Sequence, residues 1–159
     1  MSIKTASAIL ALASALTLTP TLGATQSAGS GPVAFSADDG EATDTGFALR
    51  GRAEVVQGDN RLRADAIEIT RVNGEVTQAT ASGNVYFVTS EQNARGDRAV
   101  YNIASNEVVV TGDVILTQGR NVLTGNRVVY NTRTQDARIS GGGAGGRIQG
   151  VFYPEGSGN

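Results

Sequence analysis

One amphipathic phrase occurs three times in this chain, and this repeat constrains the fold more than any other feature. The copies read GRAEVVQGDNRLRADAIEI from Gly51, GNVYFVTSEQNARGDRAVY from Gly83 and GDVILTQGRNVLTGNRVVY from Gly112. A second polar landmark follows each glycine by 14 residues, at Asp65, Asp97 and Asn126. The glycine-to-glycine periods of 32 and 29 residues are typical of stacked supersecondary units.

Apolar and polar residues alternate on both sides of each landmark, which indicates strands with two unlike faces. Each copy therefore predicts strand, turn, strand. Hairpin turns are expected between copies, at residues 71–76, 103–108 and 132–137, with Asn73-Gly74 as the clearest turn signal. No helical periodicity follows the N-terminal segment. The repeat predicts an all-β fold of short antiparallel strands.

The N-terminal segment has the features of a secretory signal peptide. Lys4 precedes an apolar run at residues 6–18, and small residues follow at 19–24. This run is shorter than the roughly 20 residues that a membrane-spanning helix needs. We expect residues 1–23 to be removed by cleavage at about residues 23–28 and the protein to be periplasmic. A retained N-terminal anchor is the alternative.

The rest of the chain divides by composition. We expect a flexible lead-in at 24–31, one β domain at 32–140, a glycine-rich linker at 141–146, a terminal strand at 147–154 and a disordered tail at 155–159. The chain contains no cysteine, so side-chain packing and ladder hydrogen bonds must stabilise the domain without disulfides.

Composition argues against most kinds of catalytic site. Without His or Cys, the common triads, thiol nucleophiles and zinc sites cannot form, and we predict no metal and no cofactor. A net charge of −2 with mixed signs provides no basic patch for nucleic acid. We interpret the carboxylates as solvated turn formers and expect a non-enzymatic protein. These carboxylates are Asp38, Asp39, Glu41, Asp44 and Asp97.

The apolar face of the repeat has two interpretations. It fills a closed core, as in a structural scaffold or adhesin, or it lines a gap between sheets that holds an apolar ligand. The inward positions supply few large side chains, and the chain has no Trp, 4 Phe and 4 Tyr. A core built from them would be thin, which favours the ligand-binding interpretation only slightly.

Five segments carry the most specific pattern in the chain. They are ADAIEITR (64–71), ASGNVYF (81–87), ARGDRAVYN (94–102), VVVTGDVILTQGRNVLTGNRVVYNTRT (108–134) and GRIQGVFYP (146–154). These segments resemble the OstA-like (LptA) family of lipopolysaccharide-transport proteins. The resemblance covers residues 33–154. It implies an open, twisted antiparallel β-jellyroll, also called a β-taco, which shields the acyl chains of lipopolysaccharide. An anchored, LptC-like member of the same fold is the alternative within this resemblance.

The resemblance also implies a lipid-binding groove and edge strands for assembly. From strand parity we expect the groove to be lined by Val33, Phe35, Val55, Ile67, Ile69, Val85, Phe87, Tyr101, Ile103, Val114, Leu116, Val128 and Tyr130. The assembly edges are expected at Val33, Ala34, Phe35, Ser36, Arg147, Ile148, Gln149, Val151, Phe152 and Tyr153. The implied partners are lipopolysaccharide through its lipid A portion, LptC-like inner-membrane and LptD-like outer-membrane jellyroll domains, and further copies of the chain bound head to tail.

Overall fold

The structure is a computed structural model that describes residues 31–141 and 146–154. Within these ranges all regular structure is β, and no helix has the length and apolar character needed to cross a membrane. The strands are β1 (Ala34–Ser36), β2 (Asp39–Thr43), β3 (Gly46–Gln57), β4 (Asn60–Val72), β5 (Glu75–Val88), β6 (Gln92–Asn102), β7 (Glu107–Gln118), β8 (Asn121–Asn131), β9 (Ala137–Ser140) and β10 (Gln149–Val151). The predicted all-β, antiparallel fold is confirmed.

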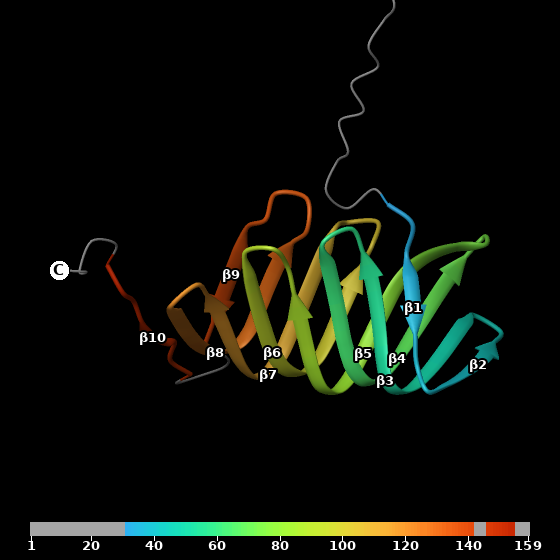
Figure 1. The fold of residues 1–159 in the computed structure, drawn as a ribbon, viewed down its shortest axis with the longest axis horizontal. Helices are drawn as coiled ribbons and strands as arrows, with labels where there is room; N and C mark the ends of the chain where they lie inside the picture. Colours follow the sequence, from blue (N-terminus) through green and yellow to red (C-terminus); the bar gives the residue numbers. More distant parts are fainter. Residues whose placement is uncertain (1–30, 142–145, 155–159) are drawn as a thin grey trace, which may run out of the picture.

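The ten strands form one antiparallel sheet that is folded along its middle. Each of the strands β3 to β8 has 11 to 14 residues, and the pairing register shifts near the centre of every ladder between them. Such irregularities bend strands. In Figure 1 the bends lie along the lower edge of the molecule and most hairpin turns lie toward the upper side.

The fold divides the sheet into two halves that face each other. Half-sheet A contains β1, the second halves of β3, β5 and β7, the first halves of β4, β6 and β8, and β10. Half-sheet B contains β2, the remaining halves of β3 to β8, and β9. We call the edge where the strands bend the bend line. The opposite edge, where two rows of hairpin turns face each other, is the rim.

Recurring residue pairs form the bend line. Gly51-Arg52, Gly83-Asn84 and Gly112-Asp113 all have positive φ, between 41° and 82°. This conformation is uncommon for residues with a side chain and easy for glycine. A Cβ built on each glycine would lie 2.8–3.1 Å from the Cβ of the aspartate opposite it, and these aspartates are Asp38, Asp65 and Asp97. The close approach therefore requires glycine at these positions.

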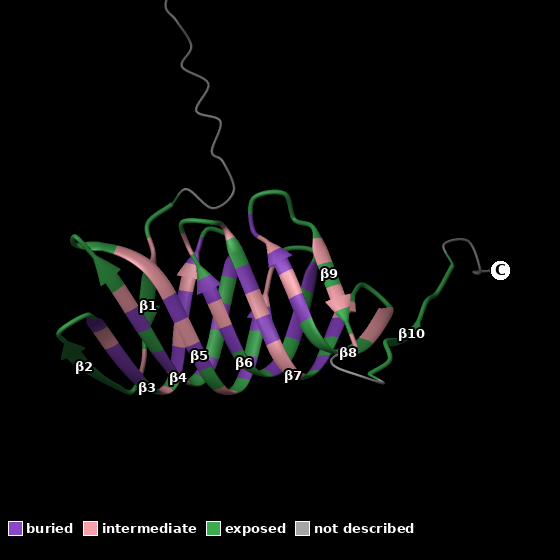
Figure 2. Ribbon diagram, turned by 180° about the vertical axis from the view of Figure 1, so that it is seen from behind, coloured by how far each residue is buried: buried purple, intermediate pink, exposed green. Residues whose placement is uncertain are grey.

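The inward-facing residues form one apolar cluster between the half-sheets. Figure 2 shows buried and exposed positions alternating along the strands. The alternation changes at the bend line. In β5 the inward spacing widens from two residues to four, from Ala81 to Val85, and in β4 it becomes three, from Ala64 to Ile67. Each strand thus keeps an apolar face inward on both sides of its bend.

Two details of the predicted fold need correction, and the predicted turns are confirmed. Asn73-Gly74, residues 103–106 and residues 132–136 connect neighbouring strands. However, the central strands are long, because the glycines bend strands in mid-course and do not begin them. The landmarks Asp65, Asp97 and Asn126 likewise lie within strands and not in turns or caps. The signal peptide, most of the lead-in, residues 142–145 of the linker and the tail lie outside the described residues.

Candidate functional site: the interior of the folded sheet

The structure brings most of the predicted groove residues together between the half-sheets. Ten of the thirteen are buried, with exposed fractions of 0–6%. These ten are Val55, Ile67, Ile69, Val85, Phe87, Tyr101, Val114, Leu116, Val128 and Tyr130. Val33 and Ile103 are partly buried and pack against the same cluster. The interior therefore runs through strands β3 to β8 as one apolar layer.

Phe35 is the exception, since 45% of it is exposed. It pairs in register with buried Val55, and residues paired in this way project from the same face of a sheet. No described strand lies beyond β1 in half-sheet A, so one side of the ring stays open. Its centroid lies 5.4 Å from that of the Phe47 ring. Phe35 therefore occupies the end of the interior.

Ten further apolar residues of the same interior were not among the predicted groove residues. They are Leu49, Ala53, Leu62, Ala64, Ala79, Ala81, Ala94, Ala99, Val108 and Val110. Period-two alternation in the outer parts of each long strand could have found them. The sequence predicts short strands because the alternation changes its spacing at the bend line. The alternation beyond each bend was therefore not assigned to the same strand. Six of these ten are alanines, so many of the unpredicted interior positions carry small side chains.

Contacts between the half-sheets fill the interior. The Phe87 ring of half-sheet A lies 5.3 Å from the Tyr130 ring of half-sheet B, measured between centroids, with 58° between the ring planes. Tilted pairs at this distance are favourable for aromatic rings. The alanines Ala79, Ala81 and Ala99 on half-sheet B are fully buried. The two inner faces are thus in direct contact in this structure.

Hydrogen bonds connect the half-sheets at the rim. The Tyr101 hydroxyl of half-sheet B donates to Oε1 of Gln57 on half-sheet A. Burial raises the pKa of Tyr101, and its hydrogen bond with Thr132 opposes this shift in part. Burial also raises the pKa of Tyr130, as does nearby Glu91, whereas hydrogen bonds with Thr89 and Gln92 lower it. A neutral hydroxyl is therefore favoured at both tyrosines.

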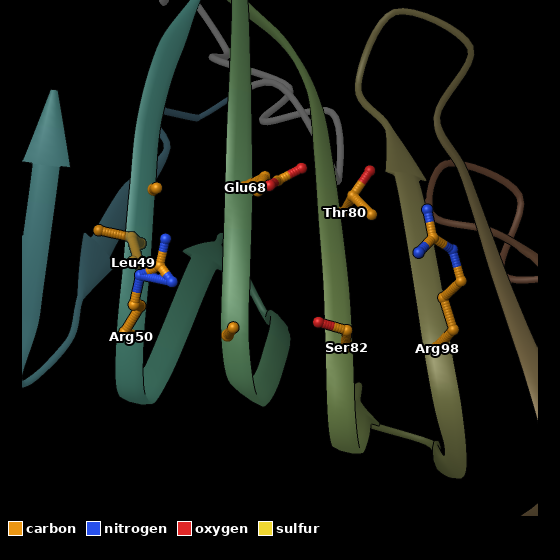
Figure 3. Close-up of a pocket in the computed structure, with 8 residues that line it drawn as sticks. Leu49, Arg50, Glu68, Thr80, Ser82 and Arg98 are labelled. Carbon is orange, nitrogen blue, oxygen red and sulfur yellow. The ribbon is translucent and has the colours of Figure 1, made fainter. Parts of the chain in front are cut away.

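The outer face of the sheet is polar. On half-sheet A, Glu54 forms ion pairs with Arg61 and Arg63, at 3.7 and 3.4 Å. On half-sheet B, a shallow hollow of about 250 Å³ is lined in part by Arg50, Glu68, Thr80, Ser82 and Arg98, which come from four neighbouring strands (Figure 3). Polar side chains dominate this hollow, so it does not suit an apolar ligand.

One ion pair stabilises the first bend. The Arg52 guanidinium donates to both carboxylate oxygens of Asp38. Hydrogen bonding with Arg52 lowers the pKa of Asp38, and the positive charge of Arg52 acts in the same direction. At the next bend, Nδ2 of Asn84 donates to Oδ2 of Asp65 at 2.8 Å. The aspartates therefore have a structural role, and among the described residues no group of three or more acidic residues could hold a metal ion.

The strands predicted as assembly edges lie at the two ends of the sheet. β1 and β10 are the terminal strands of half-sheet A, and all their residues are exposed. Near β10, the Tyr153 ring contacts Arg120 at 4.4 Å, and the Tyr153 amide donates to Asn121. The remaining predicted edge residues lie within or next to these strands, at Val33, Ala34, Ser36, Arg147, Ile148, Gln149, Val151 and Phe152.

Half-sheet B has its own terminal strands, which sequence reasoning missed. They are β2, with the sequence DGEAT, and β9, with the sequence ARIS. Asp and Gly are depleted in strands, so β2 gave no strand signal. The pair Ala37-Asp38 could have predicted β2, because it has the same sequence as Ala64-Asp65 at the next bend. Such a pair indicates a bend, and therefore a strand on each side of it. Each end of the molecule therefore presents two short strands.

Comparisons with known proteins agree with this architecture. A family model described as LptA/(LptD N-terminal domain) LPS transport protein matches residues 36–136. The crystal structure of LptH, the LptA-homologous periplasmic component of the lipopolysaccharide transport device of Pseudomonas aeruginosa, aligns with a TM-score of 0.70. Its sequence identity is 25%, and the alignment covers 80% of this chain and 99% of LptH.

A curated relative from Rhizobium meliloti (strain 1021), described as an uncharacterized protein, is 26% identical over 115 residues. This alignment covers 66% of this chain, which spans 61% of the length of the relative. The family match and the folded sheet agree. The chain belongs to the LptA/(LptD N-terminal domain) family of lipopolysaccharide transport proteins.

Proposed function

We propose that this protein is a periplasmic carrier, exported by a cleavable signal peptide. It holds the acyl chains of lipopolysaccharide between the two half-sheets and passes them from inner-membrane to outer-membrane partners. The observation that carries the proposal is the continuous apolar interior of a folded sheet in a chain of this family. The residues that we propose for acyl contact are the thirteen groove residues named above, with Phe35 at the end of the interior.

The chemistry of an acyl chain supports this assignment. Each buried CH₂ contributes about 0.8 kcal/mol, so a chain of roughly 12 carbons gains on the order of 10 kcal/mol when it leaves water. In the described part of the chain the interior is apolar along the length of the sheet, whereas the outer face carries ion pairs and arginines. Since similar contacts continue from strand to strand, a chain can move along the interior with little net change in free energy.

The two ends of the sheet support assembly into a bridge. Unpaired strand edges pair readily with further strands, and a contact between unlike ends is head to tail. Beyond the Asp38–Arg52 ion pair, the β2 end carries Asp39, Glu41 and Asp44. Near β9 and β10, Arg133, Arg138 and Arg147 outnumber Asp136. Opposite charges therefore favour contact between the β2 end of one copy and the β9–β10 end of another. LptC-like and LptD-like jellyrolls would use the same ends.

Bound lipid is the direct test of the carrier function. The mature chain is purified from the periplasm of a lipopolysaccharide-producing host, and bound lipids are identified by mass spectrometry. We expect lipopolysaccharide or its lipid A portion in molar proportion to the protein. A variant with Val85→Asp is the matched control, provided that it stays folded. Protein that carries no acyl lipid, and that binds none on addition, would contradict the proposal.

A structural β-repeat protein with a dry core is the second candidate. The near-complete burial of the inward side chains favours it, since Ala53, Ile67 and Val85 have no exposed surface. The same lipid measurement separates the two functions. A dry core predicts no bound lipid and an unfolding midpoint that does not change when lipopolysaccharide is added.

A further inference from the structure

The buried polar side chains of the described residues all lie at the rim. They are Gln57, Asn60, Gln92 and Thr132. Gln57 and Asn60 flank the β3–β4 turn, Gln92 begins β6, and Thr132 follows β8. The amide side chains of Gln57, Asn60 and Gln92 belong to half-sheet A. They occupy positions that point inward as the strand residues alternate. None of the four carries a charge, and the rest of the buried interior is apolar.

On half-sheet B, hydroxyl groups stand opposite these amides. The Tyr101 hydroxyl donates to Gln57 across the rim. Thr89 and Gln92 lie near enough to the Tyr130 hydroxyl to lower its pKa. Nε2 of Gln92 also donates to the backbone oxygen of Gln135, at 3.4 Å, in the β8–β9 turn. Neutral hydrogen bonds thus join the two half-sheets at the one long edge where no strand is continuous.

We infer that this row of neutral rim groups, formed by Gln57, Gln92, Tyr101 and Tyr130, is a subsite for the ester and amide carbonyls that join acyl chains to a polar head group. The inference rests on the proposed function and deepens it. When acyl chains occupy the interior and the head group lies in water, the linkage atoms must lie at the boundary between them. In this fold that boundary is the rim.

The chemistry of the rim groups fits a carbonyl acceptor. Acyl chains can enter only if the half-sheets separate, which breaks the hydrogen bonds across the rim. Buried donors left without partners are costly. The donors that opening would free are the Tyr101 hydroxyl and the Gln92 amide, because the amide nitrogen of Gln57 donates to the backbone oxygen of Gly31. Ester or amide carbonyls accept hydrogen bonds from such donors. In the open state the carbonyl oxygens of the ligand would therefore replace the hydrogen-bond acceptors that these donors have in the closed state.

Because the buried rim groups carry no charge, they should distinguish neutral acyl linkages from free acids. A free fatty acid would place its carboxylate at the rim, and a buried carboxylate without a cation is strongly unfavourable. The described part of the chain buries no charged side chain. The subsite should thus favour acyl chains in neutral linkage over acyl chains that end in a free acid.

A double comparison of protein and ligand tests the inference. The ligands are a glucoside with two ester-linked dodecanoyl chains and the same glucoside with two ether-linked dodecyl chains, which lacks the carbonyls. Their affinities are measured by calorimetry for the mature wild-type protein and for Tyr101→Phe/Tyr130→Phe, which keeps both rings. We expect the wild type to bind the ester ligand about tenfold more tightly than the ether ligand, as for one or two neutral hydrogen bonds.

The double variant should lose this preference and bind the two ligands equally. The ratio of affinities is informative because an easier opening of the rim would change both affinities by the same factor. A wild-type ratio near one, or an unchanged ratio in the variant, would overturn the subsite while acyl binding itself stands. Failure of the wild type to bind either ligand would overturn the carrier function as well. If the double variant does not fold, Tyr101→Phe alone and the wild-type ratio decide.

Discussion

The two long edges of the folded sheet are closed by different means. At the bend line the backbone is continuous, and glycines with positive φ, such as Gly83 and Gly112, lie against aspartates of the neighbouring strand. At the rim each hairpin turn joins two strands of the same half-sheet. Among the described residues, side-chain contacts such as Tyr101 to Gln57 join the two half-sheets there.

This difference has a mechanical consequence. Covalent continuity makes the bend line a fixed hinge, whereas hydrogen bonds at the rim can exchange partners with a ligand or with water. The inner faces between them are apolar and in contact. A carrier needs this combination, because its interior must open to admit acyl chains without losing the alignment of its strands.

The largest effect is expected from pinning the rim. The chain has no cysteine, so Gln92→Cys/Gln135→Cys provides a unique pair, which a bismaleimide with a reducible linker can join. We expect lipopolysaccharide binding to fall at least about tenfold in the cross-linked protein and to recover after reduction. The matched control is Asp65→Cys/Asn84→Cys across a bend, where cross-linking should leave binding unchanged. Equal loss in both pairs would remove the distinction between hinge and rim.

Adding a methyl group at the bend line should cause the next largest effect. In Gly112→Ala the new Cβ would lie 2.8 Å from the Asp97 Cβ, at a backbone φ of 82°. Steric overlap and positive φ together should lower the free energy of unfolding by about 2–4 kcal/mol, measured by urea denaturation.

Gly119→Ala is the control for this substitution. Gly119 also has positive φ, but no atom lies within 4 Å of its added Cβ. The loss there should be about 1–2 kcal/mol, the cost of positive φ alone. If both glycines tolerate alanine equally well, the close approach at the bend does not determine where the sheet folds.

Alkaline titration tests the rim tyrosines. Burial raises the pKa of Tyr101 and Tyr130 above the ordinary tyrosine value of about 10. The unfolded chain therefore ionises first as the pH rises, so the free energy of unfolding should be constant below about pH 9 and fall above about pH 10. Urea midpoints measured across this range should fall less steeply in Tyr101→Phe/Tyr130→Phe. Identical slopes in variant and wild type would show that these hydroxyls are not held neutral by the closed rim.

The smallest effect is expected from exchanging a bend aspartate for its amide. Asn126 occupies the third landmark position where Asp65 and Asp97 occupy the first two, so Asp97→Asn should change the free energy of unfolding by less than about 0.5 kcal/mol. Asp97→Leu is the contrasting variant, because its bulkier side chain would crowd Gly112. A large loss with Asn would mean that the charge, and not the shape, matters at the bend.

Strand parity predicted the inward face well because hydrophobic alternation reflects burial directly. Val85 and Phe87, or Val128 and Tyr130, needed only a correct local period. The bends were harder to predict, because a Gly-Asn pair such as Gly83-Asn84 also occurs in hairpin turns. The sequence of the pair does not distinguish a bend within a strand from a turn between strands. Only the three-dimensional approach of Asp65 to Gly83 distinguishes the two cases.

The exposure of Phe35 and the rim hydrogen bonds could not be predicted from the sequence. Whether Phe35 is covered depends on which strand lies beyond β1, which is a property of the ends of the sheet and not of the local pattern. Gln57 and Tyr101 are 44 residues apart, and their contact depends on how one half-sheet lies over the other. A single sequence carries no pattern for such a pair.

The most direct test of the account compares two neighbouring residues on opposite faces of β5. Phe87 is 2% exposed and faces the interior, whereas Tyr86 is 43% exposed and faces outward beside Arg95. Each is replaced in turn by azidophenylalanine, and the protein is irradiated with lipopolysaccharide under otherwise identical conditions. We expect capture of lipopolysaccharide at position 87 and none at position 86. Equal capture at both positions, or capture only at 86, would contradict an acyl-binding interior.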